Sequence, residues 1–171
     1  MAQKRHQVET RMVSEYLLAR YSKFTFILAQ PLGVVSEELL AKVGYLQAIK
    51  QMRPYRPEVD AVVILPRHLL LVEAKVWNIV NGLAKLPLYK SLVPFTPELK
   101  EYQAREVLME LVVGWTNENL EIMARDLGVK VVTYSPPWLQ QEVDRMHLYW
   151  TKEYREQREQ KLRLREHFGL E

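Results

Sequence analysis

Two strongly apolar runs stand close together near the middle of the chain, and they constrain its fold more than any other feature. One run covers residues 59–65 and the other residues 69–76, and Pro-Arg-His at 66–68 connects them. Short runs rich in Val and Leu are typical of strands that are covered on both faces. Since so short a connection suits antiparallel neighbours, the two runs predict a β-hairpin at the centre of a sheet.

The rest of the chain alternates between helical and strand patterns. We expect helices over residues 8–21, 36–51, 83–92 and 117–127, and further strands over 24–29, 107–115 and 129–134. The strand, helix and strand between 107 and 134 predict a parallel crossover. Pro87 is expected in the first turn of its helix or at a kink. The predicted fold is therefore an α/β protein with a mixed central sheet flanked by helices.

Length and composition set the outer limits. The 171 residues fit one core, and the absence of cysteine excludes a disulfide scaffold, a thiolate metal site and a cysteine nucleophile. No apolar run is long enough to span a bilayer and no secretory pattern opens the chain. We therefore expect a cytoplasmic protein, or one inside an infected host cell if it is viral. The net charge of +3 is compatible with a polyanionic partner without requiring one.

The chain changes character near residue 140. Residues 1–139 hold the expected sheet and its helices, whereas Lys and Arg alternate with Glu from residue 151 onward. That pattern is typical of a solvated helix with charge pairs along it. We expect a domain over 1–139 and a charged helical extension over 140–171, through which a homodimer or a larger assembly could form.

Three charged residues interrupt the apolar hairpin. Asp60 lies on its first strand, and Glu73 and Lys75 lie two residues apart on its second, so these two project from the same face. The hairpin would bring Asp60 near Glu73. Charges in so apolar a setting cost roughly several kcal/mol each unless they are paired or bound to metal. They form either a salt bridge in an unremarkable α/β protein or a functional site.

The segment 56–76, RPEVDAVVILPRHLLLVEAKV, resembles the PD-(D/E)XK nuclease superfamily, also called restriction-endonuclease-like. The likeness is closest to Holliday-junction-resolvase-like and phage nucleases. Asp60 matches the family's Asp, and Glu73 with Lys75 matches its (Asp/Glu)-x-Lys motif. Pro57 departs from the pattern by standing two residues from the proline of the family's Pro-Asp pair. The resemblance covers about residues 6–134 and implies a restriction-endonuclease-like sheet.

The family also carries a Glu on the helix before these strands, and two residues compete for that role. Glu9 lies inside the apolar stripe of its helix, whereas Glu15 lies at the edge of the stripe. Glu9 is followed by Met12 and Val13, as the family's Glu is followed by apolar residues. We favour Glu9; the alternative is that it faces water in a frayed first turn.

The resemblance implies metal-dependent hydrolysis of phosphodiester bonds, most readily in DNA, by endo- or exonucleolytic cleavage. It assigns catalysis to Asp60, Glu73, Lys75 and Glu9, and it assigns Mg²⁺ or Mn²⁺ binding to Asp60, Glu73, the Ala74 backbone carbonyl and Glu9. Lys75 would orient or deprotonate the attacking water, and as a base it needs a lowered pKa, which partial burial supplies. The alternative is a non-catalytic protein of the same fold that binds nucleic acid or serves a larger assembly.

A basic stretch at residues 42–57 predicts contacts with nucleic acid. It contains no acid, has interleaved tyrosines and leads directly into the strand of Asp60. The resemblance adds one lysine where many family members have Gln. The candidate binding residues are Lys42, Lys50, Arg53, Arg56, Tyr55 and Lys85. A solvated helix face is the alternative.

Overall fold

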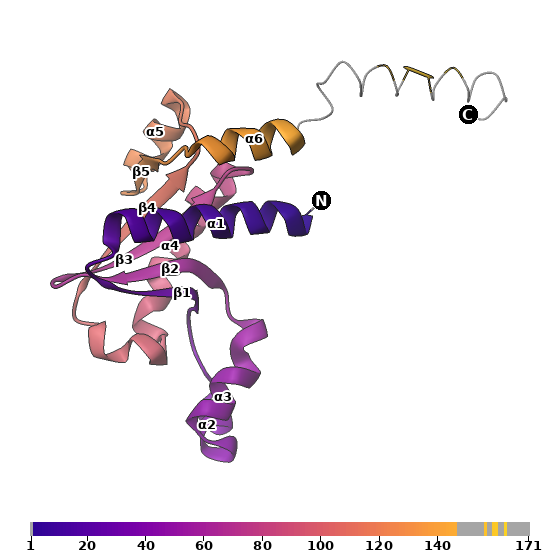
Figure 1. Ribbon diagram of the computed structural model, residues 1–171. Coiled ribbons are helices and arrows are strands. Elements are labelled where there is room, and N and C mark those ends of the chain that lie inside the picture. The colour runs from indigo at the N-terminus through magenta and orange to yellow at the C-terminus, as the bar shows by residue number, and fades with distance from the viewer. Residues whose placement is uncertain (1, 147–155, 157–158, 161–162, 164–171) are drawn as a thin grey trace. The chain divides into compact units, whose positions relative to one another are not determined.

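The computed structural model describes residues 2–146 together with 156, 159, 160 and 163 (Figure 1). The helices are α1 (Ala2–Tyr21), α2 (Glu37–Val43), α3 (Tyr45–Met52), α4 (Ile79–Leu92), α5 (Glu118–Asp126) and α6 (Pro137–Met146). The strands are β1 (Thr25–Pro31), β2 (Glu58–Ile64), β3 (His68–Lys75), β4 (Glu106–Val113) and β5 (Lys130–Thr133). Short 3-10 helices cover Arg53–Tyr55, Val93–Phe95 and Pro97–Tyr102.

The chain divides into two compact units, residues 1–134 and 135–171. The first unit holds the sheet, and the described part of the second consists mainly of α6. The division at residues 139 and 140 stays a prediction, and the charged segment from 151 onward lies almost wholly outside the described residues. Within the described part of the chain, no helix is long and apolar enough to cross a membrane. The cytoplasmic location also stays a prediction.

The five strands form one mixed sheet whose order, β1-β2-β3-β4-β5, follows the chain. β1, β2 and β3 pair antiparallel, whereas β4 is parallel to both β3 and β5. The predicted hairpin is confirmed, with Ala61 opposite Val72, and so is the parallel crossover between residues 107 and 134. The structure thus confirms the predicted α/β fold with helices flanking a mixed sheet.

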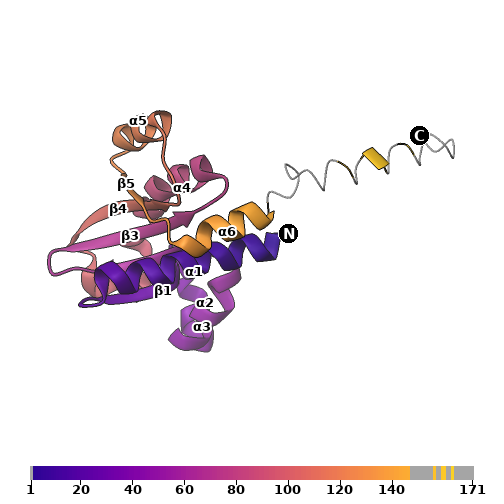
Figure 2. The ribbon, with the colours of Figure 1, turned by 45° about the horizontal axis from the view of Figure 1, so that its top comes forward.

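Different helices cover the two faces of this sheet (Figures 1 and 2). Alternation along β4 sends Glu110 toward α1, where it meets Tyr16, and Leu111 toward α4, where it lies beside Gly82. Leu71 joins Leu111 in the core on the α4 side. On the other side, α1 buries a stripe of apolar side chains, comprising Met12, Val13, Tyr16 and Leu17. Side chains of adjacent residues in one strand therefore enter different chemical surroundings.

Two helices differ from the sequence prediction for local reasons. The expected helix over 36–51 is two helices, because Gly44 has φ 77° and ψ 164°, values outside the helical region that suit glycine. α4 begins at Ile79, four residues earlier than predicted, so Pro87 lies within the helix rather than in its first turn. The earlier start matters for function, because it brings the beginning of α4 to the end of β3.

The helices α2 and α3 belong to an insertion between β1 and β2 that we call the arm, residues 34–57. Both views show these helices standing away from the sheet. α2 has no buried residue, and α3 has one, Ala48. Since these two helices contribute only Ala48 to the buried residues, stability of the sheet does not explain their presence.

Candidate active site

The site begins where β2 and β3 separate. Their regular pairing ends at Ala61 and Val72. One residue further on, the hydrogen bonds between the strands run from backbone N–H groups to side-chain carboxylates. The Ala74 N–H donates to Asp60 Oδ2 at 2.8 Å, and the Asp60 N–H donates to Glu73 Oε2 at 3.4 Å. Each carboxylate accepts from the opposite strand, so both remain fixed beside each other at the strand ends.

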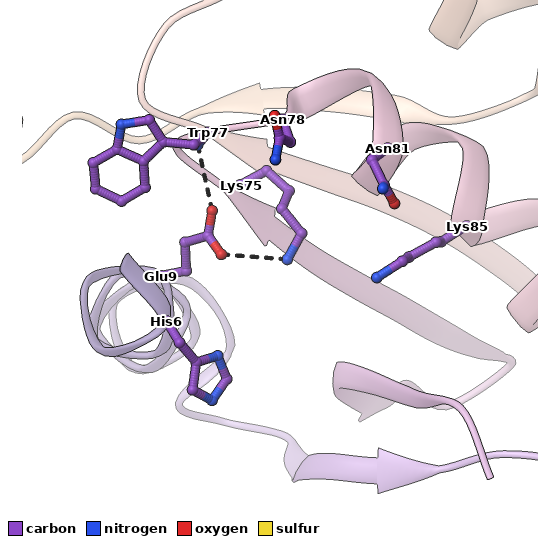
Figure 3. Close-up of a pocket in the computed structure, with 7 residues that line it drawn as sticks. All are labelled: His6, Glu9, Lys75, Trp77, Asn78, Asn81 and Lys85. Atoms are coloured by element: carbon purple, nitrogen blue, oxygen red, sulfur yellow. Dashed lines mark hydrogen bonds and ion pairs between the residues drawn. The ribbon is translucent and has the colours of Figure 1, made fainter. Parts of the chain in front are cut away.

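α1 supplies the third carboxylate. Glu9 Oε1 accepts hydrogen bonds from the Val76 N–H at 3.0 Å and the Trp77 N–H at 3.3 Å, just beyond β3 (Figure 3). Glu15, the other candidate on this helix, forms an exposed ion pair with Arg11 at 2.8 Å. The structure therefore brings Glu9, and not Glu15, to the ends of the strands.

Lys75 lies between the three carboxylates. Its Nζ is 3.1 Å from Glu73 Oε1, 3.5 Å from Glu9 Oε2 and 3.7 Å from Asp60 Oδ2. The Lys75 side chain is 15% exposed and that of Glu73 only 2%. We call these four residues the site cluster. With all groups ionised, its three carboxylates face one ammonium, so the cluster carries uncompensated negative charge.

This imbalance shifts the titration of two members. Burial, followed by repulsion from Asp60, raises the pKa of Glu73 to about 7 despite the attraction of Lys75. Burial alone would lower the pKa of Lys75, as the sequence prediction assumed, but Glu73, Asp60 and Glu9 outweigh burial and raise that pKa. Lys75 is thus a cation in this arrangement, and the lowered pKa that a base requires is not present.

Gly82 of α4 makes room for the Lys75 side chain. A Cβ at this position would overlap Lys75 Cγ and would lie 3.3 Å from Leu111 Cδ1. Since glycine is unfavourable inside a helix, close approach is the physical reason for its presence here. Sequence reasoning missed Gly82, because the predicted helix began at residue 83 and left this glycine outside it, whereas α4 begins at Ile79.

An open pocket of about 340 Å³ lies beside the site cluster (Figure 3). Its lining comprises His6, Glu9, Lys75, Trp77, Asn78, Asn81 and Lys85. The amino groups of Lys75 and Lys85 both point into the hollow between α1 and α4. Sequence reasoning identified Lys85 but missed His6 and Asn81, because both helices begin earlier than their apolar patterns indicate.

The arm holds the other predicted nucleic-acid contacts, and the structure separates them into two groups. Lys42, Lys50 and Tyr55 are exposed, Tyr55 by 81%. Arg53 instead donates to Glu58 Oε2 at 2.9 Å and to the Ala29 carbonyl at 3.1 Å. These two bonds fasten the arm to the ends of β1 and β2.

Arg56 is buried and has its own partners. Its guanidinium donates to the two carboxylate oxygens of Glu98 at 2.6 and 2.7 Å and to the Pro31 carbonyl at 3.0 Å. A side chain held in this way does not face a phosphate. Arg56 is therefore a structural residue at the foot of the arm, contrary to the sequence prediction.

The oxygen-only donors of the site cluster suit a hard divalent cation by chemistry. Burial, and after it repulsion from Asp60, raises the pKa of Glu73, and a bound cation would relieve this repulsion. However, nowhere in the described part of the chain are three His, Cys, Asp or Glu side chains grouped so that they could hold a metal ion. In this structure the Lys75 ammonium lies at the point where the carboxylates converge.

No protein-family model and no curated protein matches the chain. Among solved structures, it is similar to a repair endonuclease from Pyrococcus abyssi, with 13% identity over 74% of this chain and 47% of that chain and a TM-score of 0.47. It is also similar to a protein of unknown function, AF1548, with 12% identity, 76% and 60% coverage and a TM-score of 0.45. The chain spans less than two thirds of either.

Proposed function

We propose that this protein is a divalent-metal-dependent nuclease that hydrolyses phosphodiester bonds, with DNA as the favoured substrate. The observation that carries the proposal is the convergence of three carboxylates, from α1, β2 and β3, on the ammonium of Lys75. Like charges held together under burial are unfavourable for folding and are typical of functional sites. The PD-(D/E)XK motif that the sequence resembles consists of these same residues.

Each member of the site cluster has a distinct role in this proposal. Once the Lys75 ammonium moves from the point where the carboxylates converge, Asp60, Glu73 and the Ala74 carbonyl, together with Glu9, would hold Mg²⁺ or Mn²⁺. The cation would supply Lewis-acid stabilisation of the charge on a phosphate. Lys75, whose raised pKa keeps it charged, donates to the attacking water and to the oxygens that gain charge in the transition state.

The surroundings of the cluster would bind the substrate. Lys85 and the amide of Asn81 present donors to phosphate oxygens across the pocket from α1. Lys42, Lys50 and Tyr55 of the arm would contact the nucleic acid further from the cleavage point. A homodimer or larger assembly formed through residues 140–171 is part of the same proposal.

The test is cleavage of supercoiled, linear, single-stranded and four-way-branched DNA with Mg²⁺, with Mn²⁺ or with EDTA. We expect metal-dependent cleavage that falls by about 10²-fold or more in Asp60→Asn and Lys75→Ala. Glu9→Gln should also be impaired, whereas Glu15→Gln, an exposed carboxyl on the same helix, should cleave like the wild type. Retained cleavage in Asp60→Asn would show that the site is misassigned.

A second candidate is a non-catalytic protein of this fold that binds nucleic acid or serves a larger assembly. It is favoured by the position of Lys75, whose ammonium already gives the three carboxylates an ion-pair partner. Calorimetric titration with Mn²⁺ separates the candidates. Binding to the wild type that is lost in Asp60→Asn supports the nuclease, whereas a folded wild type without binding supports the non-catalytic protein.

A further inference from the structure

A second buried carboxylate lies on the other face of the sheet. Glu110 of β4 is 1% exposed and faces α1. It accepts hydrogen bonds from the Tyr16 hydroxyl at 2.5 Å and from the Tyr21 hydroxyl at 3.1 and 3.2 Å, and Lys130 Nζ lies 3.2 Å away. We call these four residues the anchor cluster. The single carboxylate therefore accepts hydrogen bonds from three groups, two tyrosine hydroxyls and one lysine ammonium, and both of its oxygens have partners.

The anchor cluster and the site cluster share one helix. Tyr16 and Glu9 are seven residues apart on α1, which places them about 10 Å apart along the helix and on nearly the same side of it. Glu9 reaches the amides of Val76 and Trp77 near one end, and Tyr16 reaches Glu110 near the other. The helix is thus attached to the sheet by directional bonds at two points.

Only apolar side chains fill the buried stripe between these two points. Met12 and Val13 are buried there, and their burial stabilises α1 without fixing its rotation or its position along its axis. Hydrogen bonds do fix both, because they weaken steeply when the geometry changes. A buried carboxylate is also a costly residue, since well-packed apolar side chains are often at least as stabilising. Glu110 therefore contributes specificity of placement more than stability.

The tyrosines are suited to this role. Burial, followed by the influence of Glu110, raises the pKa of both the Tyr16 and the Tyr21 hydroxyl. Both groups therefore stay protonated and remain donors at any physiological pH. The rings of Tyr16 and Tyr21 also meet edge to face, with centroids 5.9 Å apart, which holds the two hydroxyls together at the carboxylate.

We propose that Glu110 is a positioning residue that fixes the rotation and axial position of α1 and thereby holds Glu9 at the end of β3. The functional half of this inference rests on the proposed role of Glu9 in metal binding. The structural half does not, because it concerns the hydrogen bonds that Glu9 accepts from Val76 and Trp77.

The first test measures those hydrogen bonds by amide hydrogen exchange in solution NMR. In Glu110→Gln we expect exchange of the Val76 and Trp77 amides to accelerate about tenfold more than the loss of global stability accounts for, whereas amides in the middle of β3 and β4 should accelerate only by that loss. The matched control is Leu17→Ala, which removes a buried side chain of α1 outside both clusters. If both variants accelerated exchange equally at all of these amides, the proposal would be overturned, since Glu110 would then only stabilise the fold.

Tyr16→Phe provides a second variant if Glu110→Gln does not fold. It removes one donor to Glu110, keeps the ring, and should accelerate the same two amides. Unchanged exchange of Val76 and Trp77 in a folded Tyr16→Phe protein would contradict the proposal. Neither measurement requires metal or substrate, so the result is independent of whether the protein cleaves DNA.

The second test concerns the reaction. If the wild type cleaves DNA, Glu110→Gln should need about tenfold more Mg²⁺ for half-maximal cleavage, with a saturated rate within about threefold of the wild type. Leu17→Ala should leave the Mg²⁺ requirement unchanged, because loss of stability alone lowers the folded fraction at every Mg²⁺ concentration. An unaltered Mg²⁺ requirement in Glu110→Gln would overturn the link between the anchor and the site.

Discussion

The site cluster and the anchor cluster both combine a buried carboxylate with a lysine, and their strand carboxylates lie on opposite faces of one sheet, yet their charge balance differs. In the site cluster three carboxylates share Lys75, and burial with like-charge repulsion raises the pKa of Glu73 to about 7. In the anchor cluster a single carboxylate, Glu110, has two hydroxyls and an ammonium around it. The comparison teaches that one carboxylate with several donors serves the fold, whereas the excess of buried acid in the site cluster is the charge that the proposed metal ion would neutralise.

The largest expected effect is a difference in sign between carboxyl-to-amide substitutions at the two clusters. In EDTA, Glu110→Gln should lower the free energy of unfolding by about 2–4 kcal/mol, because hydrogen bonds to a buried charge are lost. Asp60→Asn should be neutral or stabilising by up to about 1 kcal/mol, since it removes the repulsion acting on Glu73. Urea unfolding measures both, and a similar loss in the two variants would remove the distinction between the clusters.

The next effect sharpens the account of how Lys75 is held. Gly82→Ala should cost about 1–3 kcal/mol of stability, because the added methyl group overlaps the stem of Lys75. In a Lys75→Ala background the same substitution should cost clearly less, since the overlapping atoms are gone. A double-mutant cycle on thermal or urea unfolding measures this coupling. Equal costs in the two backgrounds would show that Leu111, and not Lys75, limits the space.

A pH effect follows from Glu73. Its pKa is raised in the folded protein, from 4.5 to about 7, so its protonated form contributes stability that is fully present below pH 4.5 and is lost as the pH rises through about 7. In EDTA, the wild-type Tm should fall by roughly 3–6 °C relative to Glu73→Gln between pH 5 and pH 8. Differential scanning fluorimetry at constant ionic strength checks this, and parallel Tm profiles for the two proteins would contradict it.

The smallest effect concerns the arm. Replacing both Lys42 and Lys50 by Ala should weaken DNA binding several-fold in low salt. The slope of the logarithm of the binding constant against the logarithm of salt concentration should become shallower by up to about two, because fewer counterions are released. Lys90→Ala, which removes a charge outside the arm from the end of α4, is the matched control. Fluorescence anisotropy with Ca²⁺ in place of Mg²⁺ measures binding; an unchanged salt slope would remove the arm from the binding surface.

Much of the fold and the centre of the site were accessible from local periodicity. A period of two placed Glu73 and Lys75 on one face of a strand, and a helical period placed Glu9 in the buried stripe of α1. The structure brings these three residues together, as the resemblance to the PD-(D/E)XK nucleases implied. The periodicities themselves needed only neighbours in the sequence, whereas the meeting of Glu9 with the strands came from the resemblance.

The other features of the site could not be predicted, because they depend on partner residues that lie far away in the sequence. Arg56 is buried because Glu98 lies beside it, 42 residues away in the sequence. Glu110 stands between the apolar residues Met109 and Leu111 of β4, and its partner Tyr16 lies 94 residues away. The pKa of Lys75 reflects a competition between burial and three carboxylates, so its direction could not be obtained from burial alone.

The sheet adds its strands in the order in which the chain supplies them. A nascent chain that has emerged only as far as residue 85 already contains α1, the β2–β3 hairpin and every residue proposed to bind metal. Glu110 comes later, with the first strand that pairs parallel to its neighbour. If the chain folds as it is synthesised, the acidic groups can therefore meet before Glu110 is available to bond Tyr16 of α1. Pairing of β4 with β3 would then be the step that fixes the position of α1.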